Sequence, residues 1–156
     1  MTLTASRSVP IVALGACGLV LDAEGDGAHA LEVRNALESR VASAAAAGYR
    51  ADASAFQALL DELDATRSDP PAFVRANWAL HREIASLVRN GVLGGLYVAL
   101  LDIAGERLAG VIAQPGYDRR AAASVDLHRD LVGAIVAGDR DGAAEAARRH
   151  EATCAG

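Results

Sequence analysis

The strongest constraint on the fold is a series of segments, from about residue 29 onward, in which apolar residues recur at helical spacing. Leu31, Val33, Leu37 and Val41 form the first stripe, and an alanine run then leads to Gly48. Apolar residues make up 52% of the chain but aromatic residues only 4%, and alanine predominates, which favours closely packed helices over a β-sandwich. The sequence therefore predicts an all-α, antiparallel bundle of about six helices.

Glycine and proline divide this helical pattern into separate segments. After the first helix we expect helices over about residues 53–67, 71–89 and 92–112, a fifth from Pro115-Gly116 to about residue 137, and a sixth after Asp139 that extends towards Cys154. Gly138 is suited to a left-handed cap, and Asp139 is suited to the N-cap of the last helix. A length of 156 residues is typical of one domain.

The first 28 residues have a different character. Two short apolar runs, residues 9–12 and 19–21, flank the glycine-containing stretch 15–18, which predicts an irregular or β-hairpin-like segment. A polar linker then leads to the helices. A lipoprotein signal is a weak alternative, because the apolar run is short and interrupted by proline. We therefore divide the chain into an N-terminal segment, residues 1–28, and a helical domain, residues 29–156.

Charge and cysteine content exclude several classes of function. The formal net charge of −5 argues against direct binding to a phosphate backbone. Cys17 and Cys154 lie near opposite ends of the chain and form no disulfide framework, so we expect a reducing, cytoplasmic setting. The chain has no uncharged apolar run of about 18 residues, so we expect no membrane-spanning helix.

Three histidines lie among apolar residues in the predicted helices: His81, His128 and His150. Asn77 precedes His81 by four residues and shares its helix face. Imidazole is the commonest protein ligand for zinc and nickel, and histidines on separate helices can surround one ion in a bundle core. Each histidine could instead fill an apolar face, and for the set the two interpretations are about equal. We interpret His29 as a surface residue.

The order of several short motifs resembles the FCD domain, the C-terminal effector-binding domain of FadR-type members of the GntR family of transcription regulators. These motifs are Glu32-Val33-Arg34 with Ala36-Leu37-Glu38, Asn77-x-x-Leu80-His81 followed by Asn90, His128 leading to Gly138-Asp139, and Ala143 to His150. The resemblance covers about residues 30–153. It implies a helical bundle in which one Asp and three His hold a divalent metal, zinc or nickel, beside a small organic acid, and it implies a homodimer.

The metal roles of the family map onto Asn77, His81, His128 and His150. Asn77 stands where the family usually has Asp, and an amide oxygen is a weaker, neutral ligand than a carboxylate. The usual N-terminal winged helix-turn-helix is missing, since about thirty residues cannot contain one, and the N-terminal segment resembles at most the tail of its wing. We therefore expect a sensing domain that does not contact DNA by itself.

Arg34 is a candidate anchor for the carboxylate of an effector, because a guanidinium pairs with carboxylate through two parallel hydrogen bonds. The alternative is an ordinary surface ion pair with Glu38, four residues on. Two other functions stay open: a metal-dependent enzyme and a ligand-free helical dimerisation module. We predict no enzyme, because the sequence indicates no acidic residue close to the ligand candidates for acid-base chemistry.

Overall fold

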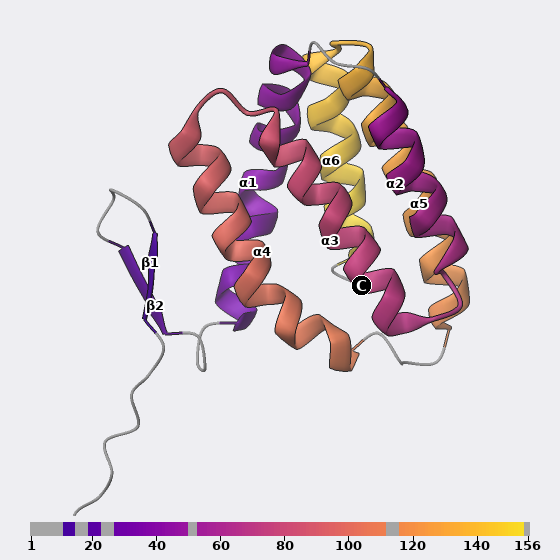
Figure 1. Cartoon of the computed structure of the whole chain (residues 1–156), viewed down its shortest axis with the longest axis horizontal. Coiled ribbons are helices and arrows are strands. Elements are labelled where there is room, and N and C mark those ends of the chain that lie inside the picture. The colour runs from indigo at the N-terminus through magenta and orange to yellow at the C-terminus, as the bar shows by residue number, and fades with distance from the viewer. Residues whose placement is uncertain (1–10, 15–18, 23–26, 50–52, 112–115, 155–156) are drawn as a thin grey trace, which may run out of the picture.

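In the part of the chain that the computed structural model describes, residues 11–14, 19–22, 27–49, 53–111 and 116–154, six helices form an all-α bundle (Figure 1). They are α1 (Gly27–Gly48), α2 (Ser54–Ala65), α3 (Pro70–Ser86), α4 (Gly91–Val111), α5 (Tyr117–Val136) and α6 (Arg140–Cys154). The predicted fold class is confirmed, and the helix ends differ by only a few residues from those expected. None of these described helices is both long enough and apolar enough to cross a membrane.

A short antiparallel hairpin precedes the bundle and lies outside it in Figure 1. Its strands are β1 (Ile11–Leu14) and β2 (Leu19–Asp22), with Ile11 paired to Asp22 and Leu14 paired to Leu19. The hairpin-like segment was predicted from its two apolar runs. The glycine stretch 15–18 and most of the proposed linker lie outside the described residues.

Caps and a tight turn set the positions of the later helices. Asp69 caps α3, where its Oδ1 accepts a hydrogen bond from the amide of Ala72 at 3.2 Å. Gly138 has a φ of 70°, a left-handed conformation that glycine adopts without strain, and the next residue, Asp139, accepts from the amide of Gly142 at 2.9 Å. The turn that these residues make folds α6 back along α5. His128 and His150 lie about equally far from that turn, and they therefore reach the same level of the bundle.

The buried face of α1 differs from the predicted stripe. Val33 is 47% exposed, and Leu31 and Leu37 are only partly buried. Val41 is buried as predicted, but the other positions buried at this spacing are Ala30, Arg34, Glu38 and Ala45. The prediction was wrong for Val33 because it weighted large apolar residues, whereas small alanines allow α1 to pack closely against α4 and α6. As a result, a charged pair on α1 points into the bundle.

Candidate metal centre

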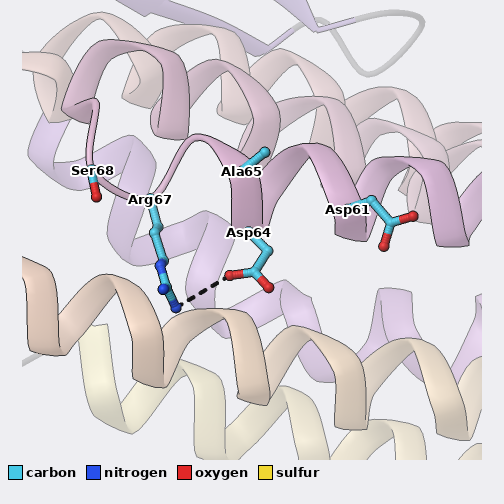
Figure 2. Close-up of a pocket in the computed structure, with 5 residues that line it drawn as sticks. All are labelled: Asp61, Asp64, Ala65, Arg67 and Ser68. Atoms are coloured by element: carbon cyan, nitrogen blue, oxygen red, sulfur yellow. Dashed lines mark ion pairs between the residues drawn. The ribbon is translucent and has the colours of Figure 1, made fainter.

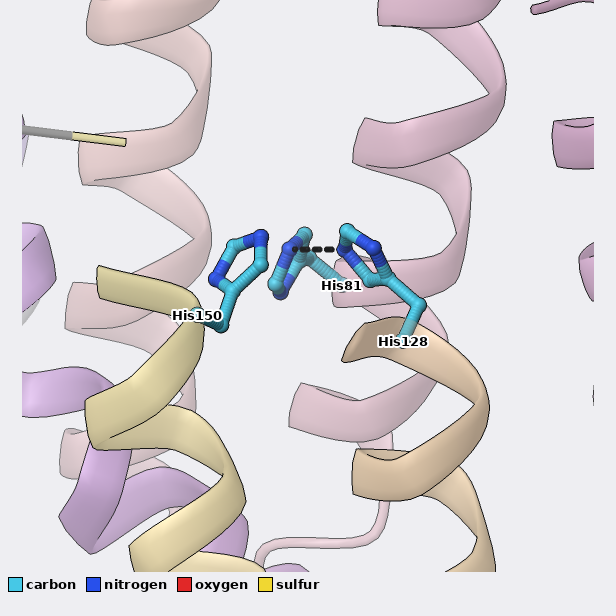
Figure 3. Close-up of side chains that lie close together, drawn as sticks. All are labelled: His81, His128 and His150. Carbon is cyan, nitrogen blue, oxygen red and sulfur yellow. Dashed lines mark hydrogen bonds between the residues drawn. The ribbon is translucent and has the colours of Figure 1, made fainter. Parts of the chain in front are cut away.

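Three histidines from three helices meet inside the bundle (Figure 3). His81 comes from α3, His128 from α5 and His150 from α6, and each is at most 2% exposed. The closest ring centroids, those of His128 and His150, are 4.4 Å apart, and those of His81 and His128 are 5.1 Å apart. One ring nitrogen of each histidine lies within 4.8 Å of those of the other two. The structure thus brings together the three histidines that the sequence singled out.

The distance between His81 and His128 fits two ligands of one ion. Their Nε2 atoms are 3.1 Å apart. Zinc binds imidazole nitrogen at about 2.1 Å, so two such ligands are separated by about 3.0 Å at a right angle and about 3.4 Å at a tetrahedral angle. The observed separation falls between these values. His150 can complete a three-nitrogen set, because its ligand atom lies within 4.8 Å of those of the other two and Figure 3 shows its ring turned towards them.

A hydrogen bond at Nδ1 of His128 determines which of its ring nitrogens can bind a metal. Its Nδ1 lies 2.6 Å from the backbone carbonyl oxygen of Ser124, one turn earlier in α5. A carbonyl only accepts, so Nδ1 carries the proton and donates, which leaves the lone pair on Nε2. A hydrogen bond of this kind orients metal-binding histidines in many proteins. His128 is therefore held with Nε2 directed towards His81.

Burial keeps His81 and His128 in the neutral form that a metal requires. Desolvation lowers the pKa of His128 to about 3, and the nearby His150 adds to this effect. Desolvation also holds the pKa of His81 well below its ordinary value, with further contributions from Arg34 and His128. At neutral pH both rings are uncharged, so binding of a cation requires no net release of a proton to solvent from either of them.

A buried ion pair on α1 lies against the histidines. Arg34 donates two hydrogen bonds to Glu38, from Nη1 to Oε2 at 2.7 Å and from Nη2 to Oε1 at 2.9 Å. The Nη2 atom also lies 3.0 Å from Nδ1 and 3.1 Å from Nε2 of His81. The guanidinium also lies over the rings of Trp78 and Tyr97, at 5.5 and 5.3 Å from their centroids. Arg34 thus contacts a carboxylate, an imidazole and two aromatic rings within the site.

Glu38 is the acidic residue of the site. Its carboxylate oxygens lie 3.2 and 3.3 Å from Nδ1 of His150, and Oε1 lies 3.3 Å from Nδ1 of His81. Burial alone raises the pKa of Glu38, but attraction by Arg34 and His150 outweighs burial and leaves the pKa below its usual value. The residue is therefore a carboxylate at neutral pH, and it is a weak proton acceptor for catalysis.

Asn77 lies one turn before His81 in α3, as predicted. Its Oδ1 is buried and has no hydrogen-bond partner among the residues that the structure describes. A buried amide oxygen without a partner costs free energy, on the order of 1–3 kcal/mol. A cation near this oxygen would offset that cost, which makes Asn77 compatible with a role as a fourth ligand.

Two predictions about charged residues need correction. Arg34 and Glu38 do form the ion pair, but their side chains are only 3% and 2% exposed, so the surface interpretation is wrong. The expectation that no acidic residue lies near the ligand candidates is also wrong, because Glu38 contacts two of them. A signal was present: Arg34 and Glu38 continue, at helical spacing, into Val41, which is buried.

The roles of Tyr97 and of the backbone of Ser124 were not predicted from the sequence. The hydroxyl of Tyr97, from α4, lies 3.2 Å from Nδ1 of His81. Burial raises the pKa of Tyr97 well above its ordinary value, and the neighbouring Glu38 adds to the effect, so the hydroxyl stays protonated. No pattern identifies a backbone carbonyl as a histidine partner before the helix pairing is known.

The surface carries a separate hollow at the end of α2, with a volume of about 480 Å³ (Figure 2). It is lined by Asp61, Asp64, Ala65, Arg67 and Ser68. Arg67 and Asp64 form an ion pair at 3.4 Å within it, and both side chains are well exposed to solvent. An exposed pair of this kind is weak, and no residue of the histidine cluster takes part. The hollow is therefore an ordinary surface feature.

The histidine cluster and the helical bundle define a class of helical effector-binding domain. The family model of the FCD domain matches residues 29–153, close to the range expected from the motifs. The chain belongs to the FCD domain family, the C-terminal effector-binding domain of GntR/FadR-type regulators. No curated protein matches the chain.

Proposed function

We propose that this chain is the sensing domain of a GntR/FadR-type regulator and that it detects a small carboxylate through a bound divalent ion. His81, His128 and His150 hold the ion, with Asn77 as a weaker fourth contact. Zinc suits three imidazoles best, and nickel is the alternative. The observation that carries the proposal is the convergence of three buried histidines whose ligand atoms lie within 4.8 Å of one another.

The charge balance of the site favours an anionic effector. Imidazoles that bind an ion are neutral and Asn77 is uncharged, so these ligands contribute no charge, and the charges of Arg34 and Glu38 cancel. A divalent ion would leave an excess of about two positive charges in a buried site, where charges are poorly screened. A carboxylate or dicarboxylate that completes the coordination of the ion would neutralise part of this excess.

Arg34 is the candidate second anchor for the carboxylate. In the structure its Nη2 lies 3.1 Å from Nε2 of His81, the atom that is needed for the ion. Arg34 cannot stay this close to Nε2 once a cation is bound there, because the two positive charges repel each other. Its guanidinium then has donors available for an effector beside the ion, while it stays attached to Glu38.

Helix α1 is the element that would transmit the effect of ligand binding to other parts of the protein. It carries both Arg34 and Glu38, and it packs against α3, α4, α5 and α6. An effector that binds one arrangement of α1 better than another shifts the population between them, and a domain attached on the N-terminal side of α1 would respond. The proposal includes a homodimer and a cytoplasmic setting, as is usual for regulators that act on DNA.

A thermal-shift screen of small organic acids tests this function. The zinc-loaded protein and the protein treated with a chelator are compared with monocarboxylates, dicarboxylates and tricarboxylates. An acid present at about 100 times its Kd stabilises the folded state by about 2.7 kcal/mol, which raises the Tm of a domain of this size by roughly 5–10 °C. We expect this rise only in the zinc-loaded protein.

Two arginine variants identify the anchor. Arg34→Lys keeps the positive charge beside Glu38 but loses the fork of two parallel donors, so the effector-dependent rise in Tm should shrink. Arg40→Lys, at an exposed position of the same helix, is the matched control and should behave like the wild type. Stabilisation that does not depend on the metal, or that is equal in both variants, contradicts the proposed mode of binding.

A further inference from the structure

Glu38 is the one carboxylate that contacts two of the candidate ligands in the described structure. It is 2% exposed, and its contacts reach Nδ1 of His150 at 3.2 Å and Nδ1 of His81 at 3.3 Å. In both cases Glu38 faces the ring nitrogen on the side away from the Nε2 atoms. A carboxylate at this place resembles the carboxylate-histidine-metal arrangement that orients ligands in metalloproteins.

The contact with Glu38 determines which ring nitrogen of His150 carries the proton. A carboxylate accepts and does not donate, so Nδ1 of His150 carries the proton and Nε2 keeps its lone pair. Figure 3 shows Nε2 of His150 on the side of the ring that faces His81 and His128. With the carbonyl of Ser124 acting in the same way on His128, two of the three histidines are set to bind through Nε2.

For His81 the proton must change place when an ion binds. Nε2 of His128 keeps its lone pair and lies 3.1 Å from Nε2 of His81, so in the structure Nε2 of His81 donates to it and Nδ1 of His81 accepts from Nη2 of Arg34 at 3.0 Å. Binding through Nε2 requires the proton on Nδ1 instead. Oε1 of Glu38, 3.3 Å from Nδ1, is a negatively charged acceptor already in place for that proton.

We propose that Glu38 is a positioning residue that directs His81 and His150 to bind the ion through Nε2 and supplies the negative charge that Asn77 lacks. The inference rests on the proposed metal site. Its physical basis is that one ionised carboxylate accepts hydrogen bonds from two Nδ1–H groups and compensates the charge of a cation at the same time. Glu38 is both the acceptor for Nδ1–H of His81 and the ion-pair partner of Arg34. Binding of the ion therefore ends the contact of Arg34 with His81 and leaves Arg34 bound to Glu38 alone.

The first experiment uses the wild-type protein and therefore does not depend on the folding of a variant. Two-dimensional ¹H–¹⁵N NMR spectra that correlate ring protons with ring nitrogens assign the tautomer of each histidine, with and without zinc. With zinc, all three clustered histidines should carry the proton on Nδ1 and bind through Nε2, and His81 alone should change tautomer on loading. Binding of His81 or His150 through Nδ1 overturns the inference.

The second experiment measures zinc affinity by competition with a chromophoric chelator. Glu38→Gln keeps the size and an acceptor oxygen but removes the charge, and we expect affinity to fall about 10–100-fold. Glu62→Gln, at an exposed position of α2, is the matched control and should leave affinity unchanged.

A third variant separates charge compensation from a purely structural role. If Glu38 supplies the missing charge, Asn77→Asp should raise zinc affinity about tenfold more in the Glu38→Gln background than in the wild-type background. Equal gains in the two backgrounds, or unchanged affinity in Glu38→Gln, overturn the inference while leaving the metal site intact. Failure of the wild-type protein to bind zinc contradicts the proposed function itself.

Discussion

Acid should destabilise the metal-free protein well above the pH at which carboxylates titrate. The pKa of His128 falls from the ordinary value of 6.5 to about 3 in the folded state, mainly because of burial. Below pH 6.5 the unfolded chain binds a proton that the folded chain does not, so stability is complete above that pH and is lost as pH falls. One pKa unit corresponds to about 1.4 kcal/mol, and the loss from His128 alone reaches about 2 kcal/mol at pH 5.

His81 should add to this loss, because burial also holds its pKa well below the ordinary value. The free energy of unfolding, measured by urea denaturation with a chelator present, should therefore fall between pH 7.5 and pH 5 by more than the contribution of His128 alone, about 2 kcal/mol. His128→Gln should reduce the slope by about 1.4 kcal/mol per pH unit, whereas His29→Gln, at an exposed position, controls for the loss of an imidazole. A flat profile, or an unchanged slope in His128→Gln, refutes the account of the buried neutral rings.

Three other perturbations have defined outcomes. Arg34→Met leaves Glu38 buried without its cation and should lower the free energy of unfolding by about 3–5 kcal/mol in urea denaturation. Replacing both residues by Met should recover most of that loss, and equal losses in the two variants would contradict the buried pair. Gly48→Ala should destabilise the protein by roughly 1–3 kcal/mol, because the added Cβ would overlap the carbonyl oxygen of Leu87. Gly133→Ala places its Cβ in open space and should stabilise the protein by about 0.5–1 kcal/mol. Reversed signs in thermal denaturation would show that the helices pack differently. Gel-shift assays at low salt should detect no discrete, competitor-resistant DNA complex, because the net charge is −5.

Helical periodicity predicted the fold because each helix of a bundle buries one face, and the turn residues mark where the face is interrupted. Gly138 and Asp139 are an example, since the left-handed glycine and the capping carboxylate were both expected and both are present. The same reasoning placed Val33 of α1 inwards, where Arg34 and Glu38 are buried instead. Apolar size is a poor guide where alanines make the close contacts and where a charged pair is buried, as at Arg34 and Glu38.

The three histidines could be named from the sequence, because each lies on an apolar helix face, but their convergence could not. Convergence depends on how α3, α5 and α6 pair, and spacing along the chain carries no information on pairing. The role of Glu38 was harder still to predict. It lies on another helix, and its position four residues after Arg34 is equally typical of a solvent-exposed ion pair.

The most direct test of the central claim is a calorimetric zinc titration of the purified protein, together with elemental analysis of the loaded form. We expect about one ion per chain in the wild type, the same in His29→Ala, whose imidazole is exposed, and none in the variant with alanine at positions 81, 128 and 150. Circular dichroism verifies that each variant remains helical. No binding by the wild type, or equal binding by a folded triple variant, would contradict the assignment of this cluster as a metal centre.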